Sequence, residues 1–392
     1  MKRRAAALCA LTIVSGAIAT AAPAGAAPPT GVPDAVVALG DSAISGEAGR
    51  WAGNTNGSPS RVDALGSTAY HDVLGGEAIA GCHRSKAAEI HIGVAVSKNL
   101  ACSGARTYTQ PYSSGSNFKP GLDFYDDGAG HVGQAKALQQ YARTHRVRLV
   151  VVLIGANNFG FASVVQTCLT NWLTSPSWWK NYCNDDSSVR ALFTPTYIDQ
   201  QRQRVIGAFQ NVKQAMDNAE YEPGDYRLVA QTYSSPIPRR DGFRYPETGF
   251  TRQTIGGCGI WNRDADWAND TMVNVLNGVV KDAAAAHGIP VLDAQGTLAR
   301  HRLCENTVGL LEERGIANWT TPGAADQTEW VSQIRTVTTL VPPYQLQEDL
   351  HPSYWGQLAL RNCVRQLYAR SGGGTCRSEG GMDGTEPNMA LD

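Results

Sequence analysis

The chain has 392 residues, of which 42% are hydrophobic, and this is enough apolar material for the core of one large α/β domain. Its 34 basic and 35 acidic residues give a formal net charge of −1, so we expect neither nucleic acid nor an anionic membrane surface as a partner. Beyond the N-terminus, no stretch approaches the ~20 apolar residues that a spanning helix needs, and we expect no stable membrane anchor.

The N-terminal residues have the pattern of a secretory signal peptide. The basic start Lys2-Arg3-Arg4 precedes an apolar stretch of small residues from Ala5 to Thr20, and Ala24-Gly25-Ala26 fits an A-x-A cleavage site. We therefore expect a secreted, extracellular protein. Its expected parts are a signal peptide over residues 1–26, a single domain over residues 27–376 and a flexible Gly-rich tail over residues 377–392.

Apolar runs and helical patterns alternate along the domain. Four runs are continuously apolar, as in buried parallel strands, and cover residues 34–41, 148–154, 226–231 and 289–293. Helices are expected over residues 131–145, 198–219, 264–287 and 353–369. This alternation predicts an α/β fold with a doubly wound parallel sheet flanked by helices. The long irregular segments between these elements are expected to be functional loops.

The cysteines indicate disulfide bonds. Cys9 lies in the expected signal peptide, and its removal would leave eight of the nine cysteines. An even number in an exported chain without a CxxC pair favours disulfides over a metal cluster. Of the 105 connectivities that eight cysteines permit, we expect the sequential one: Cys82–Cys102, Cys168–Cys183, Cys258–Cys304 and Cys363–Cys376. The histidine and aspartate spacings match no zinc or calcium motif, so we expect no metal and no cofactor.

Two polar residues stand where an open α/β sheet binds its ligands. Ser42 follows the first strand and Asn157 the second, and ligands bind beyond the carboxyl ends of such strands. Far downstream, His351 offers a base that could take the proton of a serine as it attacks an acyl carbon. Each of these residues also has a structural interpretation, as a turn or helix-cap residue.

Four sequence blocks, taken together and in order, resemble the SGNH (GDSL-type) hydrolase superfamily, especially its secreted actinobacterial lipases and esterases. The blocks are Gly40-Asp41-Ser42, Asn99 to Ala105, Gly155-Ala156-Asn157-Asn158 and His351-Pro352. The resemblance covers roughly residues 34–368 and implies a flavodoxin-like sheet. Ala43, Ile44 and Asn158 depart from the usual pattern.

The resemblance also assigns roles to residues. It implies that Ser42 is the nucleophile, that His351 is the base, and that an oxyanion hole is formed by the backbone amides of Ser42 and Gly104 and the side chain of Asn157. The sequence Cys82-His83-Arg84-Ser85 is similar to the same branch and supports the pairing of Cys82 with Cys102.

The group that orients His351 is left open by the sequence. The family pattern D-x-x-H places Glu348 in the position of the acid, whereas Asp349 stands two residues before the histidine. Some members of this branch use a main-chain carbonyl instead. Asp349, Glu348 and a main-chain carbonyl are thus three alternatives.

The resemblance implies a secreted serine carboxylic-ester hydrolase that acts on lipid or fatty-acyl esters. We expect the protein to be a monomer. A polysaccharide acetyl or feruloyl esterase is the alternative within enzymes. The alternative from another class is a non-catalytic extracellular carbohydrate-binding protein that kept the fold.

Overall fold

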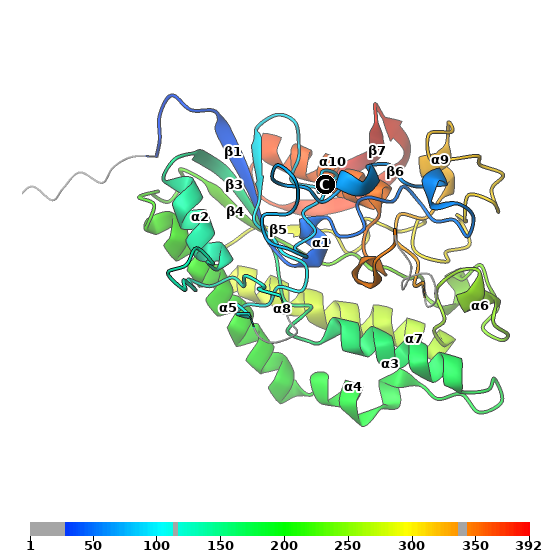
Figure 1. Ribbon diagram of the computed structural model, residues 1–392. Coiled ribbons are helices and arrows are strands. Elements are labelled where there is room, and N and C mark those ends of the chain that lie inside the picture. The colour runs from blue at the N-terminus through cyan, green and yellow to red at the C-terminus, as the bar shows by residue number, and fades with distance from the viewer. Residues whose placement is uncertain (1–27, 113–116, 336–342) are drawn as a thin grey trace, which may run out of the picture.

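The computed structural model describes residues 28–112, 117–335 and 343–392 (Figure 1). The expected signal peptide lies outside these residues. Within them, a seven-stranded sheet has the order β2-β1-β3-β4-β5-β6-β7. Its strands are β1 Asp34–Gly40, β2 Val96–Asn99, β3 Arg146–Leu153, β4 Arg227–Gln231, β5 Val291–Asp293, β6 Gly374–Asp383 and β7 Glu386–Leu391. Neighbouring strands are parallel except for β6 and β7.

Helices flank the sheet on both faces. The longer ones are α2 Gln134–Ala142, α3 Phe161–Thr174, α5 Pro195–Asp217, α8 Val273–Ala286 and α10 Tyr354–Ala369. Short helices are α1 Ser42–Ser45, α4 Ser187–Leu192, α6 Thr251–Thr254, α7 Asn262–Trp267 and α9 Ala324–Gln327. Figure 1 shows α2, α5 and α8 along one side of the sheet and α10 on the other. The doubly wound α/β fold is thus confirmed, and β2-β1-β3-β4-β5 is the flavodoxin-like strand order.

The first strand explains why the block Gly40-Asp41-Ser42 has its glycine. Residues 35–39 of β1 are fully buried between the two helical layers. Gly40 ends the strand with a φ of +140°, and a Cβ there would lie 1.9 Å from the carbonyl oxygen of Leu153 on β3. Only glycine allows this approach, which delivers Ser42 to the carboxyl edge of the sheet.

The expected flexible tail over residues 377–392 is wrong. These residues belong to β6 and β7, which pair as an antiparallel hairpin at the edge of the sheet. Leu391 and Met389 are buried, and the Glu386 carboxylate pairs with Arg361 and Arg365 of α10. Gly380 and Gly381, which suggested mobility in the sequence, lie within β6, where the pairing register shifts between Ser378 and Met382.

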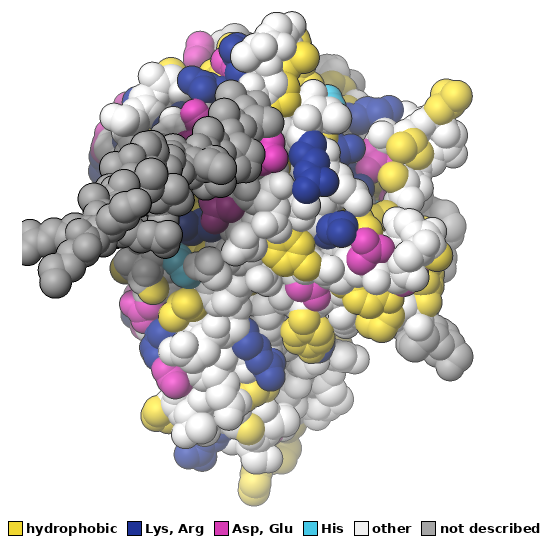
Figure 2. Space-filling view, turned by 90° about the vertical axis from the view of Figure 1, so that its left-hand side faces the viewer, with side chains coloured by type: hydrophobic (Ala, Val, Ile, Leu, Met, Phe, Trp, Pro, Cys, Tyr) yellow, Lys and Arg dark blue, Asp and Glu magenta, His cyan; other side chains and the backbone are white. Residues whose placement is uncertain are grey.

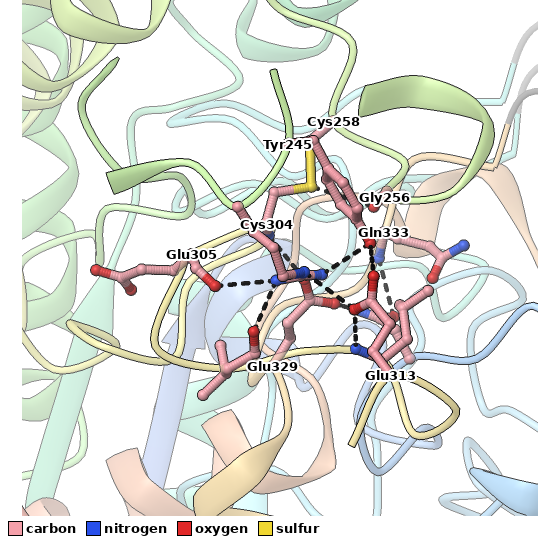
Figure 3. Close-up of polar contacts among 12 residues, drawn as sticks. Tyr245, Gly256, Cys258, Cys304, Glu305, Glu313, Glu329 and Gln333 are labelled. Carbon is pink, nitrogen blue, oxygen red and sulfur yellow. Dashed lines mark hydrogen bonds and ion pairs between the residues drawn. A yellow bond between two sulfur atoms is a disulfide. The ribbon is translucent and has the colours of Figure 1, made fainter. Parts of the chain in front are cut away.

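The four sequential disulfides are confirmed. Around Cys258–Cys304 a polar network orders the long loops (Figure 3). The buried Glu329 carboxylate accepts hydrogen bonds from the Arg244 guanidinium at 2.8 Å and from the backbone amide of Cys304 at 2.7 Å. The Arg244–Glu329 ion pair and the Cys258–Cys304 disulfide thus link these loops to one another.

Two surface properties bear on partners. On the face shown in Figure 2, basic and acidic side chains are interspersed, in keeping with the near-zero net charge. Among the described residues, no helix has the length and hydrophobicity needed to cross a bilayer.

Candidate active site

Ser42 and His351 meet at the carboxyl edge of the sheet. Ser42 opens α1 directly after β1, and Asp41 caps this helix by accepting a hydrogen bond from the backbone amide of Ala43 at 3.2 Å. The Ser42 hydroxyl lies 2.6 Å from Nε2 of His351. Leu350 beside the histidine has a φ of +62°, a strained left-handed conformation that turns His351 toward the serine.

The orienting partner of His351 is a main-chain carbonyl. Nδ1 of His351 lies 3.0 Å from the carbonyl oxygen of Asp349. Since a carbonyl oxygen can only accept, Nδ1 carries the proton, and Nε2 is free to accept the proton of Ser42. Desolvation is the largest influence on the pKa of His351 and lowers it, so the ring is a neutral base near pH 7.

The two carboxylates that the sequence offered for this position lie elsewhere. Glu348 accepts hydrogen bonds from the Tyr70 hydroxyl at 2.6 Å and from the backbone amide of Gln345 at 3.0 Å. Burial raises the pKa of Asp349 to about 8, and its Oδ2 has no hydrogen-bond partner among the described residues. Neither side chain contacts the imidazole of His351, so the geometry corresponds to the third alternative.

The three expected oxyanion donors surround the same cavity as Ser42 and His351. Ser42, Gly104 and Asn157 all line it. Gly104 has a φ of +78°, which its missing side chain permits. Asn157 follows β3, and its amide nitrogen donates to the carbonyl of Ala105 at 3.0 Å, which fixes the amide beside the Gly104 loop. Its second N–H is available to an oxyanion.

Tyr233 connects the turn that carries Ser42, called here the nucleophile turn, to the loop that carries Asn157. This role was not identified from the sequence. Its hydroxyl donates to the Asp41 carboxylate at 2.5 Å and accepts from the backbone amide of Ala156 at 3.0 Å. Burial raises the pKa of Asp41 to about 7. Tyr233 lies two residues beyond the end of β4, and this position past a strand end was the available signal.

The cavity beside Ser42 is about 200 Å³ in volume and mainly apolar. Its apolar wall includes Leu153, Phe161, Val273, Leu276 and Leu298. A second cavity of about 30 Å³ shares Phe161, Pro236, Val273 and Leu350 with the first and extends the apolar lining to Val164, Ile260 and Met272. Within the described residues, no group of three or more His, Cys, Asp or Glu is arranged to hold a metal ion.

The fold and these groups define a class: an α/β protein with a serine–histidine pair and amide donors at the carboxyl edge of its sheet. No family model and no curated protein matches the chain.

Solved structures with similarity to this chain include extracellular hydrolases. An extracellular lipase from Streptomyces rimosus is 18% identical, with a TM-score of 0.42 over 83% of this chain and 94% of that one. For phospholipase A1 from Streptomyces albidoflavus NA297 the identity is 18% and the TM-score 0.41, over 82% and 94%. A family two carbohydrate esterase from Clostridium thermocellum is 11% identical, with a TM-score of 0.34 over 86% and 64%. Because these TM-scores are below 0.5, the proposal below depends on the site's own geometry.

Proposed function

We propose that the protein is a secreted serine carboxylic-ester hydrolase of the SGNH type, acting on lipid or fatty-acyl esters. The observation that carries this proposal is the 2.6 Å contact between the Ser42 hydroxyl and Nε2 of a histidine whose Nδ1 proton is already fixed. A serine is a poor nucleophile without such a base. The four disulfides support an extracellular location.

The arrangement supports a two-step acyl transfer. The Ser42 oxygen attacks the ester carbonyl carbon while its proton passes to Nε2 of His351, and the oxyanion is held by the amides of Ser42, Gly104 and Asn157. His351 then returns the proton to the leaving alcohol as the ester C–O bond breaks. Water attacks the acyl-enzyme by the same route, giving its proton to His351, and the carboxylic acid leaves as Ser42 regains its proton.

The apolar wall supports an acyl chain as the group that is bound. Phe161, Val273 and Leu276 offer hydrocarbon contacts beside Ser42, and each buried methylene contributes about 0.8 kcal/mol. An acetyl group would leave most of this wall empty. We therefore expect longer acyl chains to be preferred.

The test is hydrolysis of p-nitrophenyl esters from acetate to palmitate by the mature protein. We expect activity that rises beyond acetate and is lost in Ser42→Ala. A fluorophosphonate probe should label Ser42, while Ser45→Ala, which removes the neighbouring hydroxyl, should still be labelled. An acetate-only profile would contradict the fatty-acyl substrate and favour carbohydrate deacetylation. A folded protein with neither activity nor labelling would contradict hydrolysis and favour the binding protein.

A further inference from the structure

A buried ion pair that the reaction above does not use lies next to the nucleophile turn. Glu47 is fully buried, and its two carboxylate oxygens lie 2.7 and 2.9 Å from Nδ1 of His83. His83 is also buried, and Glu77 approaches its Nε2 at 3.7 Å. Burial of a carboxylate costs several kcal/mol unless a partner offsets it. A site that keeps such a pair in its core calls for an explanation.

The pair is attached to both halves of the active site. The backbone amide of Glu47 donates to the carbonyl of Ser42 at 3.1 Å, at the end of α1. His83 follows Cys82, whose disulfide partner Cys102 leads into the loop of Gly104. His83 itself has a φ of +48°, a left-handed conformation that is costly for a histidine. The Glu47–His83 pair thus lies between the nucleophile turn and the oxyanion loop.

Glu47 is also a charged carboxylate that acts on His351. Burial alone would raise the pKa of Glu47, but hydrogen bonding and charge from His83 hold it below its ordinary value. By contrast, burial raises the pKa values of Glu348 and Asp349. Arg335 faces Asp349, and Tyr70 binds Glu348.

The charge of Glu47 reaches His351. Desolvation lowers the pKa of His351, the negative charge of Glu47 raises it, and the weaker opposite effect of His83 lowers it again. The carbonyl of Asp349 orients the ring but carries no full charge. The negative charge of Glu47 therefore favours the imidazolium that forms during reaction.

We propose that Glu47, held by His83, is a positioning residue that supplies the negative charge a triad aspartate would supply by contact, and that fixes the turn carrying Ser42. This inference rests on the proposed function.

The test replaces Glu47 by its neutral isostere. In Glu47→Gln we expect kcat to fall about tenfold with KM within about twofold, and the acid limb of kcat/KM to move about one unit to lower pH, since one pKa unit corresponds to a factor of ten. The shift is downward because loss of the anion makes His351 easier to deprotonate. The pH dependence of fluorophosphonate labelling of Ser42 should shift in the same way, and Glu47→Asp, which keeps the charge, should restore the limb toward the wild-type position.

Glu77→Gln is the matched control because it removes a charge from the other side of His83. In this variant kcat should stay within about twofold of wild type. The acid limb of kcat/KM should stay close to its wild-type position, well short of the displacement by one pKa unit, a factor of ten, expected for Glu47→Gln. If Glu47→Gln does not fold, the double variant Glu47→Gln with His83→Gln replaces the ion pair by two amides. A smaller shift in the same direction is then expected, because both opposing charges are lost.

The outcomes separate this inference from the proposed function. An active wild type that is silenced by Ser42→Ala, together with an unshifted acid limb in Glu47→Gln, or in the double variant if Glu47→Gln does not fold, overturns the inference alone. An inactive, unlabelled wild type overturns the proposed function instead.

Discussion

His351 donates its Nδ1 proton to the main-chain carbonyl of Asp349, while the carboxyl group of the same residue takes no part in orienting the ring. A carbonyl fixes the tautomer as a carboxylate does. It differs in carrying no full negative charge, and it cannot be removed by a side-chain substitution.

The first prediction follows from this contact. Asp349→Asn and Glu348→Gln should each keep kcat within about threefold of wild type, far from the 10⁴-fold loss seen when a triad aspartate is replaced. The reason is that neither carboxylate contacts His351. Steady-state kinetics on one p-nitrophenyl ester measures this. A loss of two orders of magnitude in either variant would mean that a carboxylate orients the histidine after all.

The second prediction concerns Asn157. Asn157→Ala should lower kcat by about 10²–10³ with little change in KM, because an oxyanion donor acts in the transition state. Asn158→Asp is the matched control: Asn158 accepts from the Thr107 backbone amide at 3.1 Å and lies one residue further along the loop. It should keep most of the turnover. Equal losses in both variants would show that the loop, and not the donor, had been damaged.

The sheet and the site were largely predictable from sequence. The strands β1, β3 and β4 are buried on both faces, so each has a continuous apolar run. Such a run can be recognised in the sequence without knowing which elements pack against it. Ser42 and Asn157 follow two of these strands, and the parallel topology brings strand ends together. His351 was found through its resemblance block.

The missed features depend on tertiary contacts. β2 is short and mainly exposed, and β6 contains glycines and polar residues, so neither strand had an apolar run. The choice between the Asp349 carbonyl and the nearby carboxylates depends on the left-handed turn at Leu350, which no composition reveals. The contact of Glu47 with His83 joins residues 36 positions apart.

The third prediction concerns a buried carboxyl group outside the active site. Glu89 is almost fully buried, and burial raises its pKa to about 8 from 4.5. The folded state therefore binds a proton that the unfolded state releases, so this group's contribution to stability is present below pH 4.5 and is lost as pH rises through about 8.

Glu89→Gln removes this proton linkage. The variant should be more stable than wild type by about 5 kcal/mol above pH 8, since the pKa of Glu89 rises from 4.5 to about 8 and each pKa unit corresponds to about 1.4 kcal/mol. At pH 4.5 the two proteins should be nearly equally stable. Urea unfolding at both pH values measures the difference, and an equal change in unfolding free energy at the two would contradict the assigned protonation.

The last prediction compares two disulfides that close loops of similar length. Cys82–Cys102 and Cys363–Cys376 span 20 and 13 residues, so replacing either pair by serines should cost about 3 kcal/mol of stability. Turnover should separate them. Cys82 and Cys102 each adjoin site residues, namely His83 and the loop of Gly104, whereas Cys363–Cys376 ties α10 to β6.

At a temperature where both double variants are folded, loss of Cys82–Cys102 should lower kcat at least about tenfold, because displacement of one oxyanion donor alone can cost about 10²–10³. Loss of Cys363–Cys376 should leave kcat close to wild type while lowering Tm. Thermal unfolding and steady-state kinetics on the same preparations test both statements. If turnover falls equally in the two variants, the Cys82–Cys102 bridge stabilises the domain without holding the oxyanion loop in place.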